Sequence, residues 1–292
     1  MVTMVSVSGT HCLITGATRG LGNVLARTFW EAGANLVLVA RREEDLERLI
    51  AELGKRAGQQ AITLPADLAN PDATEKIAKL VNAKVPQLNT LINNAAILGP
   101  IGPLVENDWL AWLNALQVDL ISPIALCRAL APCLIRHGGG SIINLSGGGA
   151  TGPRPNFTAY ATAKCGLVRF SETLAEELRP HNVRVNCIAP GAMNTTMLAE
   201  VVIRGANAAG EKEYANALKV QRGGGVSMQR VAELCVFLTS AAGGSITGKL
   251  INATWDPWPS LPEHLDDLNN SDIYTLRRIV PKDRGKTWGN DA

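Results

Sequence analysis

The chain has 292 residues and a mass of 31.0 kDa, enough to bury a large hydrophobic core without disulfides or a structural metal. Its 46% hydrophobic and 18% charged residues exclude general disorder. The 28 Lys and Arg residues nearly balance the 26 Asp and Glu residues, so the net charge of +2 gives no case for a nucleic-acid partner. No apolar run approaches the roughly 20 residues of a membrane span, and the first residues lack a signal-peptide pattern. We therefore expect neither nucleic acid nor a membrane as a partner.

The apolar strands and amphipathic helices of the chain alternate. In chain order, the pattern predicts a strand at 11–15, a helix at 21–32, a strand at 35–40, a helix at 43–56, a strand at 61–68, a helix at 71–84 and a strand at 88–96. It continues with a long helix over about 107–137, a strand at 141–146, a helix at 157–178, a strand at 182–189, a helix at 226–240 and a strand at 249–254.

These strands are continuous apolar runs, which is typical of a parallel sheet covered on both faces. The alternation predicts an α/β fold of the Rossmann type, a doubly wound parallel sheet of about seven strands with helices on both faces. We assign residues 1–254 to this single domain. Residues 195–222 break the pattern and predict one or two short helices with a mobile Gly/Ala/Asn stretch. Residues 255–292 hold four prolines and three of the six tryptophans, and we expect this C-terminal extension to pack on the body or on a neighbouring subunit.

The six cysteines include no Cys-x-x-Cys pair, and most lie among Leu, Ile, Val and Ala. Free cysteine behaves as a small apolar residue in such surroundings, so we expect reduced core thiols and a cytoplasmic location. The four histidines are scattered without the spacing of metal ligands, and we expect no metal site.

A Gly-rich turn follows the first predicted strand and opens the first helix. Its residues 15–22 read TGATRGLG. Glycines let the backbone approach a pyrophosphate closely, and the helix N-terminus offers unpaired N–H groups and a partial positive charge. The turn therefore predicts a dinucleotide site.

The end of the second strand indicates which dinucleotide binds. An acidic residue there would bind the ribose hydroxyls and repel a 2′-phosphate, but the chain has Arg41 and Arg42 after Ala40, and Arg19 in the nearby turn. Guanidinium groups bind phosphate dianions well. We therefore predict NADP(H) as the cofactor, with NAD(H) as the less favoured alternative.

Five motifs in this order resemble those of the short-chain dehydrogenase/reductase family, over residues 9–252. They are the Gly-rich turn, Asp67 after the third strand, the run N93-N94-A95-A96, the pair Y160-x-x-x-K164, and P190-G191-x-x-x-T195. The resemblance implies reversible hydride transfer between NAD(P)(H) and a carbonyl or alcohol.

The resemblance also implies roles for single residues. Asp67 is expected to contact the adenine ring, Asn93 to secure the central sheet, and Thr195 to hold the nicotinamide carboxamide. Together with the turn and the arginines, the residues expected to bind the cofactor are Gly16, Thr18, Arg19, Gly20, Leu21, Gly22, Arg41, Asp67, Leu68, Asn94, Ala95, Tyr160, Lys164, Pro190, Gly191 and Thr195.

Tyr160 and Lys164 stand four residues apart on a predicted helix and therefore share one face. Carbonyl reduction needs a proton donor, and the reverse reaction needs a base. A neighbouring ammonium and an oxidised nicotinamide favour the phenolate, so we expect Lys164 to lower the pKa of Tyr160. Tyr160 is the predicted general acid/base, and Lys164 is expected to hold the ribose hydroxyls as well.

The chain departs from the family at two catalytic positions. The usual serine, thirteen residues before the tyrosine, is Gly147, while Ser146 stands one residue earlier. In a regular strand Ser146 would face away from the site, whereas a bulge permitted by the following glycines would bring it round. Either Ser146 orients the substrate carbonyl, or a threonine, a water or backbone N–H groups replace it. Asp119 stands where the family often has an Asn, and it is either a member of the proton relay or a structural carboxylate.

The sequence thus predicts an NADP(H)-dependent oxidoreductase with Tyr160, Lys164, Ser146 and Asp119 as its catalytic residues. The alternative is an NADP(H)-binding sensor or scaffold of the same fold. Apolar residues in the loops around the site favour an apolar alcohol or ketone substrate, namely Ile97, Leu98, Ile101, Pro153, Phe157, Met193 and Met197. Arg154 and Arg204 are either contacts for an anionic group or solvated surface charges. The resemblance implies a homo-tetramer or homodimer, formed through helices whose apolar sides include Leu126, Leu130, Leu167 and Phe170.

Overall fold

Seven parallel strands form one sheet with the order β3-β2-β1-β4-β5-β6-β7 in the computed structural model, which describes residues 5–288. The strands are β1 (His11–Thr15), β2 (Asn35–Ala40), β3 (Ala61–Pro65), β4 (Thr90–Asn93), β5 (Gly140–Leu145), β6 (Val183–Ala189) and β7 (Leu250–Asn252). This confirms the predicted doubly wound sheet. Residues 1–4 of the predicted domain and 289–292 of the predicted extension lie outside the described range.

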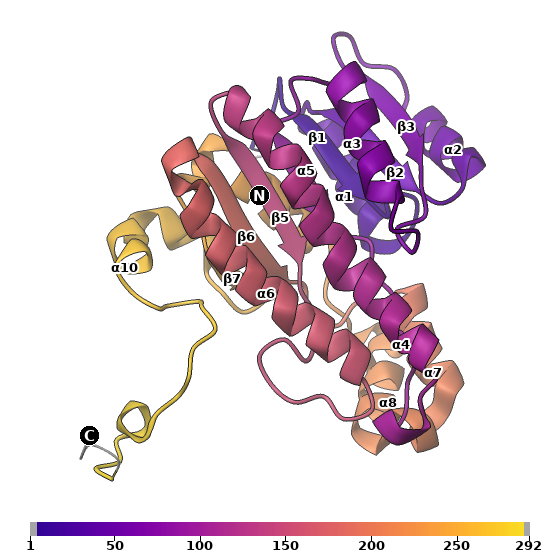
Figure 1. Ribbon diagram of the computed structural model, residues 1–292, viewed down its shortest axis with the longest axis vertical. Coiled ribbons are helices and arrows are strands. Elements are labelled where there is room, and N and C mark those ends of the chain that lie inside the picture. The colour runs from indigo at the N-terminus through magenta and orange to yellow at the C-terminus, as the bar shows by residue number, and fades with distance from the viewer. Residues whose placement is uncertain (1–4, 289–292) are drawn as a thin grey trace.

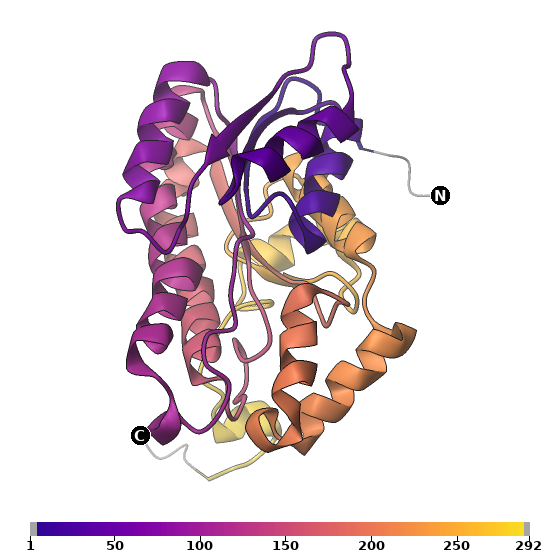
Figure 2. The same cartoon turned by 90° about the vertical axis from the view of Figure 1, so that its right-hand side faces the viewer.

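Helices cover both faces of the sheet (Figures 1 and 2). They are α1 (Gly20–Glu31), α2 (Glu43–Leu53), α3 (Ala73–Lys84), α4 (Trp109–Leu116), α5 (Ser122–Arg136), α6 (Thr158–Leu178), α7 (Thr196–Ala209), α8 (Glu211–Lys219), α9 (Met228–Thr239) and α10 (Leu265–Asn269).

Neighbouring residues of one strand belong to different cores. In β1, Cys12 and Ile14 pack in the cluster that includes α1, α2 and α9, whereas Leu13 packs in the cluster that includes α3 and α5. Successive side chains of a strand point to opposite faces, and both faces are covered here. This is why the strands are continuous apolar runs.

The long helix predicted at 107–137 is α4 and α5 joined by a π-helical turn, Gln117–Ile121. A π-turn inserts an extra residue into a helix and is frequent at functional sites; this one carries the buried Asp119. By length and composition the whole run Trp109–Arg136 could cross a membrane, but Leu126 and Leu130 are fully buried in the protein core. The burial of these residues indicates that this helical run packs in the protein core.

Residues 195–222, which interrupt the alternation of strands and helices, form two helices, α7 and α8, which lie below the sheet in Figure 2. Gly205 and Gly210 adopt positive φ angles, 76° and 86°, which bend the backbone within and between these helices. We call α7 and α8 the lid helices.

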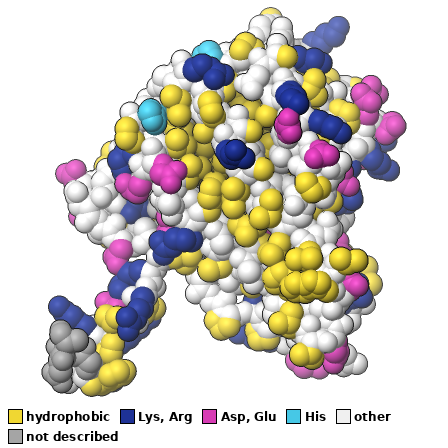
Figure 3. All heavy atoms as spheres, viewed as in Figure 1, with side chains coloured by type: hydrophobic (Ala, Val, Ile, Leu, Met, Phe, Trp, Pro, Cys, Tyr) yellow, Lys and Arg dark blue, Asp and Glu magenta, His cyan; other side chains and the backbone are white. Residues whose placement is uncertain are grey.

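The C-terminal extension begins on the body and then leaves it. Trp258 is buried against Phe237 with ring centres 5.2 Å apart, whereas Trp255 is exposed. Leu276 still contacts the body, since its N–H donates to Glu172 of α6. Beyond it the chain forms a projecting arm (Figures 1 and 3).

Candidate active site

The carboxyl ends of the central strands border a groove of about 1200 Å³. In open parallel sheets this is where ligands bind. The groove brings together most of the predicted residues: Gly16, Thr18, Arg19, Gly20, Leu21, Gly22, Arg41, Asp67, Leu68, Asn94, Ala95, Ser146, Tyr160, Lys164, Pro190 and Thr195. Two predicted residues, Gly191 and Asp119, are not on its wall.

The Gly-rich turn is packed so closely that it leaves no room for a side chain at Gly22 and little at Gly16. A Cβ atom on Gly22 would overlap the carbonyl oxygen of Gly16, and one on Gly16 would lie 3.0 Å from the Cα of Ala95. Asn94 fixes the turn by donating from Nδ2 to the carbonyl oxygens of Thr15 and Gly16, at 2.9 and 3.3 Å. No side chain caps the N-terminus of α1, so its N–H groups can receive an anion. These residues fit a dinucleotide pyrophosphate.

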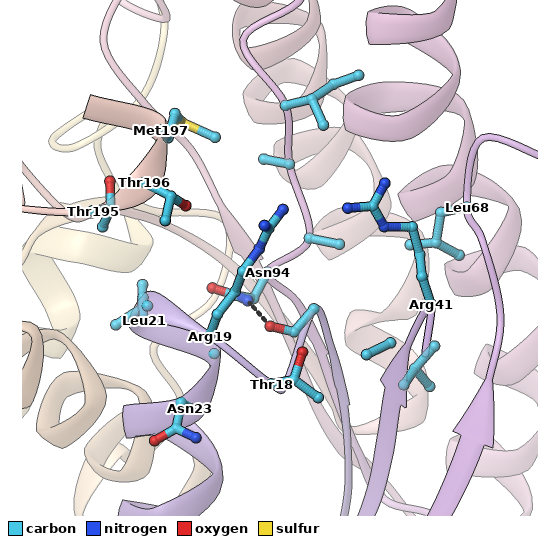
Figure 4. Close-up of a pocket in the computed structure, with 18 of the residues that line it drawn as sticks. Thr18, Arg19, Leu21, Asn23, Arg41, Leu68, Asn94, Thr195, Thr196 and Met197 are labelled. Carbon is cyan, nitrogen blue, oxygen red and sulfur yellow. Dashed lines mark hydrogen bonds between the residues drawn. The ribbon is translucent and has the colours of Figure 1, made fainter. Parts of the chain in front are cut away.

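Two arginines point into this groove from separate elements, Arg19 from the turn after β1 and Arg41 from the end of β2 (Figure 4). Neither forms an ion pair within residues 5–288. The adjacent Arg42, in contrast, is 2.6 Å from Asp45. Arg19 and Arg41 are thus the cations available to a phosphate group.

Asn93 supports the groove from below. Its Nδ2 donates to Oδ1 of Asn144 at 2.7 Å, and this bond joins β4 to β5 inside the core. Asn144 in turn donates to Oγ of Ser171 on α6 at 2.7 Å. The predicted role of Asn93 in securing the central sheet agrees with this geometry.

Tyr160 and Lys164 lie on the first turns of α6 and are buried together with Asp119. Lys164 Nζ lies 5.5 Å from the centre of the Tyr160 ring and 3.5 Å from Oδ2 of Asp119, and it donates to the carbonyl oxygen of Leu145 at 3.1 Å. Oδ1 of Asp119 accepts the Ile97 N–H at 2.9 Å. Asp119 therefore contacts Lys164 from behind the groove wall.

Burial is the largest single influence on the pKa of each group in this cluster. It raises the pKa of Tyr160 by more than Lys164 lowers it, and Asp119 raises it further. Lys164 does lower the pKa of Tyr160, as expected, but the net shift is upward because burial raises this pKa by more. Burial also raises the pKa of Asp119 to about 6, against the opposing charge of Lys164. Burial lowers the pKa of Lys164, but Asp119 and Tyr160 raise it by more.

Gly147 makes room for the Tyr160 hydroxyl. A Cβ atom on Gly147 would overlap the hydroxyl oxygen of Tyr160, so the family serine does not fit there with Tyr160 in this place. Ser146 directly follows the last residue of β5, Leu145, and its N–H still donates to the Ile188 carbonyl of β6 at 2.8 Å. Ser146 lines the groove, and its buried Oγ has no hydrogen-bond partner in the described part of the chain.

The motif P190-G191-x-x-x-T195 follows β6, and only some of its residues line the groove. Thr195 caps α7, where its Oγ1 accepts the Leu198 N–H at 3.3 Å, and it also lines the groove. Gly191 has a φ of 78°, and a Cβ there would lie 2.7 Å from Val226. Gly191 thus turns the backbone behind the groove rather than forming its wall.

Several wall residues differ from those expected. Leu98 and Phe157 are buried in a cluster with Tyr160 and are not on the wall, whereas Ile97, Met193 and Met197 are. Sequence reasoning missed Asn114, Val118 and Glu200. Asn114 and Val118 stand four residues apart on one helical run, a spacing that places them on one side, but nothing in the sequence showed that this side faces the groove.

Comparison with known proteins places this site in a family. The short chain dehydrogenase family profile matches residues 10–204. Nodulation protein G of Rhizobium sp. (strain N33) is 33% identical over 250 residues, covering 85% of this chain and 97% of that protein. Dehydrogenase/reductase SDR family member 4 of Sus scrofa is 28% identical over 240 residues, covering 82% of this chain and 84% of that protein.

A solved structure, L-sorbose reductase from Gluconobacter frateurii complexed with NADPH and L-sorbose, superposes with a TM-score of 0.75 at 27% identity, covering 86% of this chain and 97% of that one. The chain therefore belongs to the short-chain dehydrogenase/reductase family, the NAD(P)-dependent oxidoreductases that act on alcohols and ketones.

Proposed function

We propose that this chain is an NADP(H)-dependent oxidoreductase in which Tyr160 is the general acid/base. The observation that carries the proposal is the meeting of Tyr160 and Lys164 with the Gly-lined turn in one groove. When bound, the nicotinamide supplies or accepts the hydride. The Tyr160 hydroxyl donates the proton to the carbonyl oxygen in reduction and removes it from the alcohol in oxidation.

The neighbouring residues of Tyr160 are proposed to assist this proton transfer by their charge or by positioning other groups. Lys164 favours the phenolate by its charge and is expected to bind the ribose hydroxyls, while Asp119 keeps Lys164 and the Ile97 backbone in position. The Ser146 hydroxyl lies on the groove wall and has no hydrogen-bond partner within residues 5–288, which fits the role of orienting the substrate carbonyl. Pro190 and Thr195 form the wall on the lid side, and Gly191 turns the backbone behind it.

The test is Tyr160→Phe, assayed with a panel of ketones and NADPH. We expect turnover to fall by roughly 100-fold or more, because the proton donor is lost, while NADPH fluorescence still reports binding. Tyr214→Phe on α8 is the control. Undiminished turnover of the Tyr160 variant would refute the catalytic role. Cofactor binding without turnover in the wild type would instead favour the sensor or scaffold.

The preference for NADP(H) over NAD(H) is supported by the guanidinium groups of Arg19 and Arg41, which point into the groove and pair with no carboxylate of the described residues. The NADPH bound to L-sorbose reductase fits the same preference. We expect Arg41→Ala to weaken NADP⁺ binding roughly tenfold or more and to leave NAD⁺ binding unchanged. Arg42→Ala should have a smaller effect, since Asp45 already pairs with Arg42. Equal loss for both nucleotides would contradict the assignment.

The substrate is proposed to be a small, largely apolar alcohol or ketone, because Ile97, Met193 and Met197 line the same groove as Tyr160. The bound sugar of the sorbose reductase makes polyols the competing class to include in the panel. The six cysteines form no disulfide within residues 5–288, and we propose the cytoplasm as the compartment.

A homodimer or homotetramer is supported by an apolar surface over α4 and the π-turn (Figure 3), with Trp109, Leu110, Leu113 and Ile121 exposed. Leu126, Leu130 and Leu167 are core residues instead, so they are not available to a partner. Light scattering should give a dimer or tetramer, and Leu110→Glu should shift it toward monomer. A wild-type monomer at micromolar concentration would contradict the proposal.

A further inference from the structure

A loop rich in glycine and proline, residues 147–157, joins β5 to α6 and carries Arg154 over the rings of Phe157 and Tyr160. The guanidinium carbon of Arg154 lies 4.0 Å from the ring centre of Phe157 and 5.6 Å from that of Tyr160. The side chain is only 17% exposed. Arg154 is therefore not a solvated surface charge, which was one of the two expectations for it.

The partner of Arg154 is a carboxylate on the lid. Nε and Nη2 of Arg154 donate to Oε2 of Glu213 on α8, at 3.1 and 2.8 Å. Charge-assisted bonds in a partly buried place are stronger than surface ion pairs. Lid residues such as Val201 and Ala217 also pack in the cluster that holds Tyr160 and Phe157. The ion pair thus fastens the lid helices to the loop that covers the catalytic tyrosine.

The glycines of the loop let Arg154 fold back onto Tyr160. Gly149 has a φ of 96°, and a Cβ on it would lie 2.6 Å from Cβ of Ala161 and 3.3 Å from Cβ of Arg154. A residue with a side chain at this position would push the loop off α6. The run Gly147–Gly149 thus has two consequences: it has no side chain at the position of the family serine, and it lets the Arg154 guanidinium lie close to Tyr160.

Four charged groups surround Tyr160. Lys164 on α6 and Arg154 on the loop favour its phenolate, Asp119 on the π-turn opposes it, and Glu213 on α8 lies behind Arg154. Lys164 is neutralised in part by Asp119, which contacts it at 3.5 Å. Arg154 adds a second positive charge beside Tyr160, and although Glu213 offsets part of that charge, the net effect of Arg154 is to lower the pKa of the buried phenol.

We propose that Arg154 is a positioning residue that adds a second positive charge beside Tyr160 and, through Glu213, ties the lid helices over the catalytic site. This inference rests on the proposed function of Tyr160 as general acid/base. The two partners have separable effects. The charge of Arg154 favours the Tyr160 phenolate, whereas Glu213 holds the lid and, through its contact with Arg154, can only oppose that effect.

The first measurement is the pH dependence of kcat/KM for alcohol oxidation. We expect Arg154→Met to move the acid limb to higher pH by about one unit, because a cation that favours the phenolate is lost. Arg154→Lys should restore the wild-type limb. Glu213→Gln should leave the limb in place or move it to lower pH, while raising KM several-fold and speeding hydrogen exchange of the α8 amides. Arg204→Met, an exposed arginine on α7, is the control.

The second measurement does not depend on turnover. The chain has three tyrosines, so the ultraviolet titration of the NADP⁺-bound protein minus that of Tyr160→Phe isolates the Tyr160 phenolate. The same upward shift for Arg154→Met is expected there. Two results with an active protein would overturn the inference. In the first, Arg154→Met changes neither the Tyr160 titration nor the pH profile. In the second, Glu213→Gln shifts both as far upward as Arg154→Met does. A protein without turnover that still shows the titration shift overturns only the proposed oxidoreductase function.

Discussion

Gly147 shows how one missing side chain decides the place of Tyr160, the proposed general acid/base. The Tyr160 hydroxyl occupies the space that a Cβ atom would need. Gly147→Ala should therefore displace the phenol and lower kcat roughly 100-fold, since a shift of about 1 Å in a catalytic group has that effect. Gly148→Ala is the matched control, because its Cβ would make an ordinary 3.6 Å contact with Arg154. Cofactor affinity should be unchanged in both, and wild-type turnover of Gly147→Ala would show that Tyr160 can move at no cost.

Asp119 makes folding stability depend on pH. Burial raises its pKa from 3.8 to about 6 in the folded chain, so the folded chain binds this proton more tightly than the unfolded chain. The contribution of this carboxyl to stability is complete below pH 3.8 and is lost as the pH rises to about 6. Asp119→Asn removes this titration. When the pH rises from 5 to 7.5, the free energy of unfolding of the wild type should therefore fall by about 1 kcal/mol relative to that of the variant, which corresponds to about 2 °C in Tm. Thermal unfolding of both proteins at the two pH values measures the difference, and parallel curves would place the pKa of Asp119 elsewhere.

Strand β5 carries a buried polar chain that joins four elements. Asn144 accepts from Asn93 on β4 and donates to Ser171 on α6, and Ser171 accepts from the Cys187 thiol of β6. Asn144→Leu would leave buried partners unpaired, and we expect a loss of about 2–4 kcal/mol in the free energy of unfolding.

The matched control for this chain lies in the same strand. Ser141 is buried, and its Oγ has no hydrogen-bond partner among the described residues. Ser141→Ala removes no bond and should be neutral or slightly stabilising. Denaturant unfolding of both variants is the measurement, and equal losses would mean that burial alone, not the polar chain, accounts for the effect.

At the scale of the whole molecule, we propose that the extension 255–292 begins as part of the catalytic body. Trp258 packs on Phe237, lies 5.6 Å from the Arg230 guanidinium and donates to the Ala253 carbonyl at 3.2 Å. Trp258→Ala should cost about 3 kcal/mol of unfolding free energy through the cavity it leaves. Trp255→Ala, at an exposed position of the same segment, should change it by less than about 0.5 kcal/mol. Similar values for the two variants would show that the extension is not part of the cooperative core.

Local features of the sequence were sufficient for the fold class, the dinucleotide turn and the Tyr160–Lys164 pair. Apolar strand runs, helical periodicity and motifs confined to one turn or one βα unit depend on neighbours in the chain. Boundaries were less exact: the helix predicted to end at residue 56 ends at Leu53, where Gly54 stops it. The π-turn was missed because the apolar pattern runs through it unchanged.

Only the tertiary structure decided which charged groups meet in the site, which residues form its wall and how the pKa of Tyr160 shifts. It brought Asp119 to Lys164 and Glu213 to Arg154, pairs that are 45 and 59 residues apart in the chain. It also placed Ser146 on the groove wall and removed Gly191 from it. The pKa of Tyr160 rises because desolvation exceeds the effect of Lys164. Desolvation depends on which elements pack over a group, and the periodicity of the sequence does not contain that information.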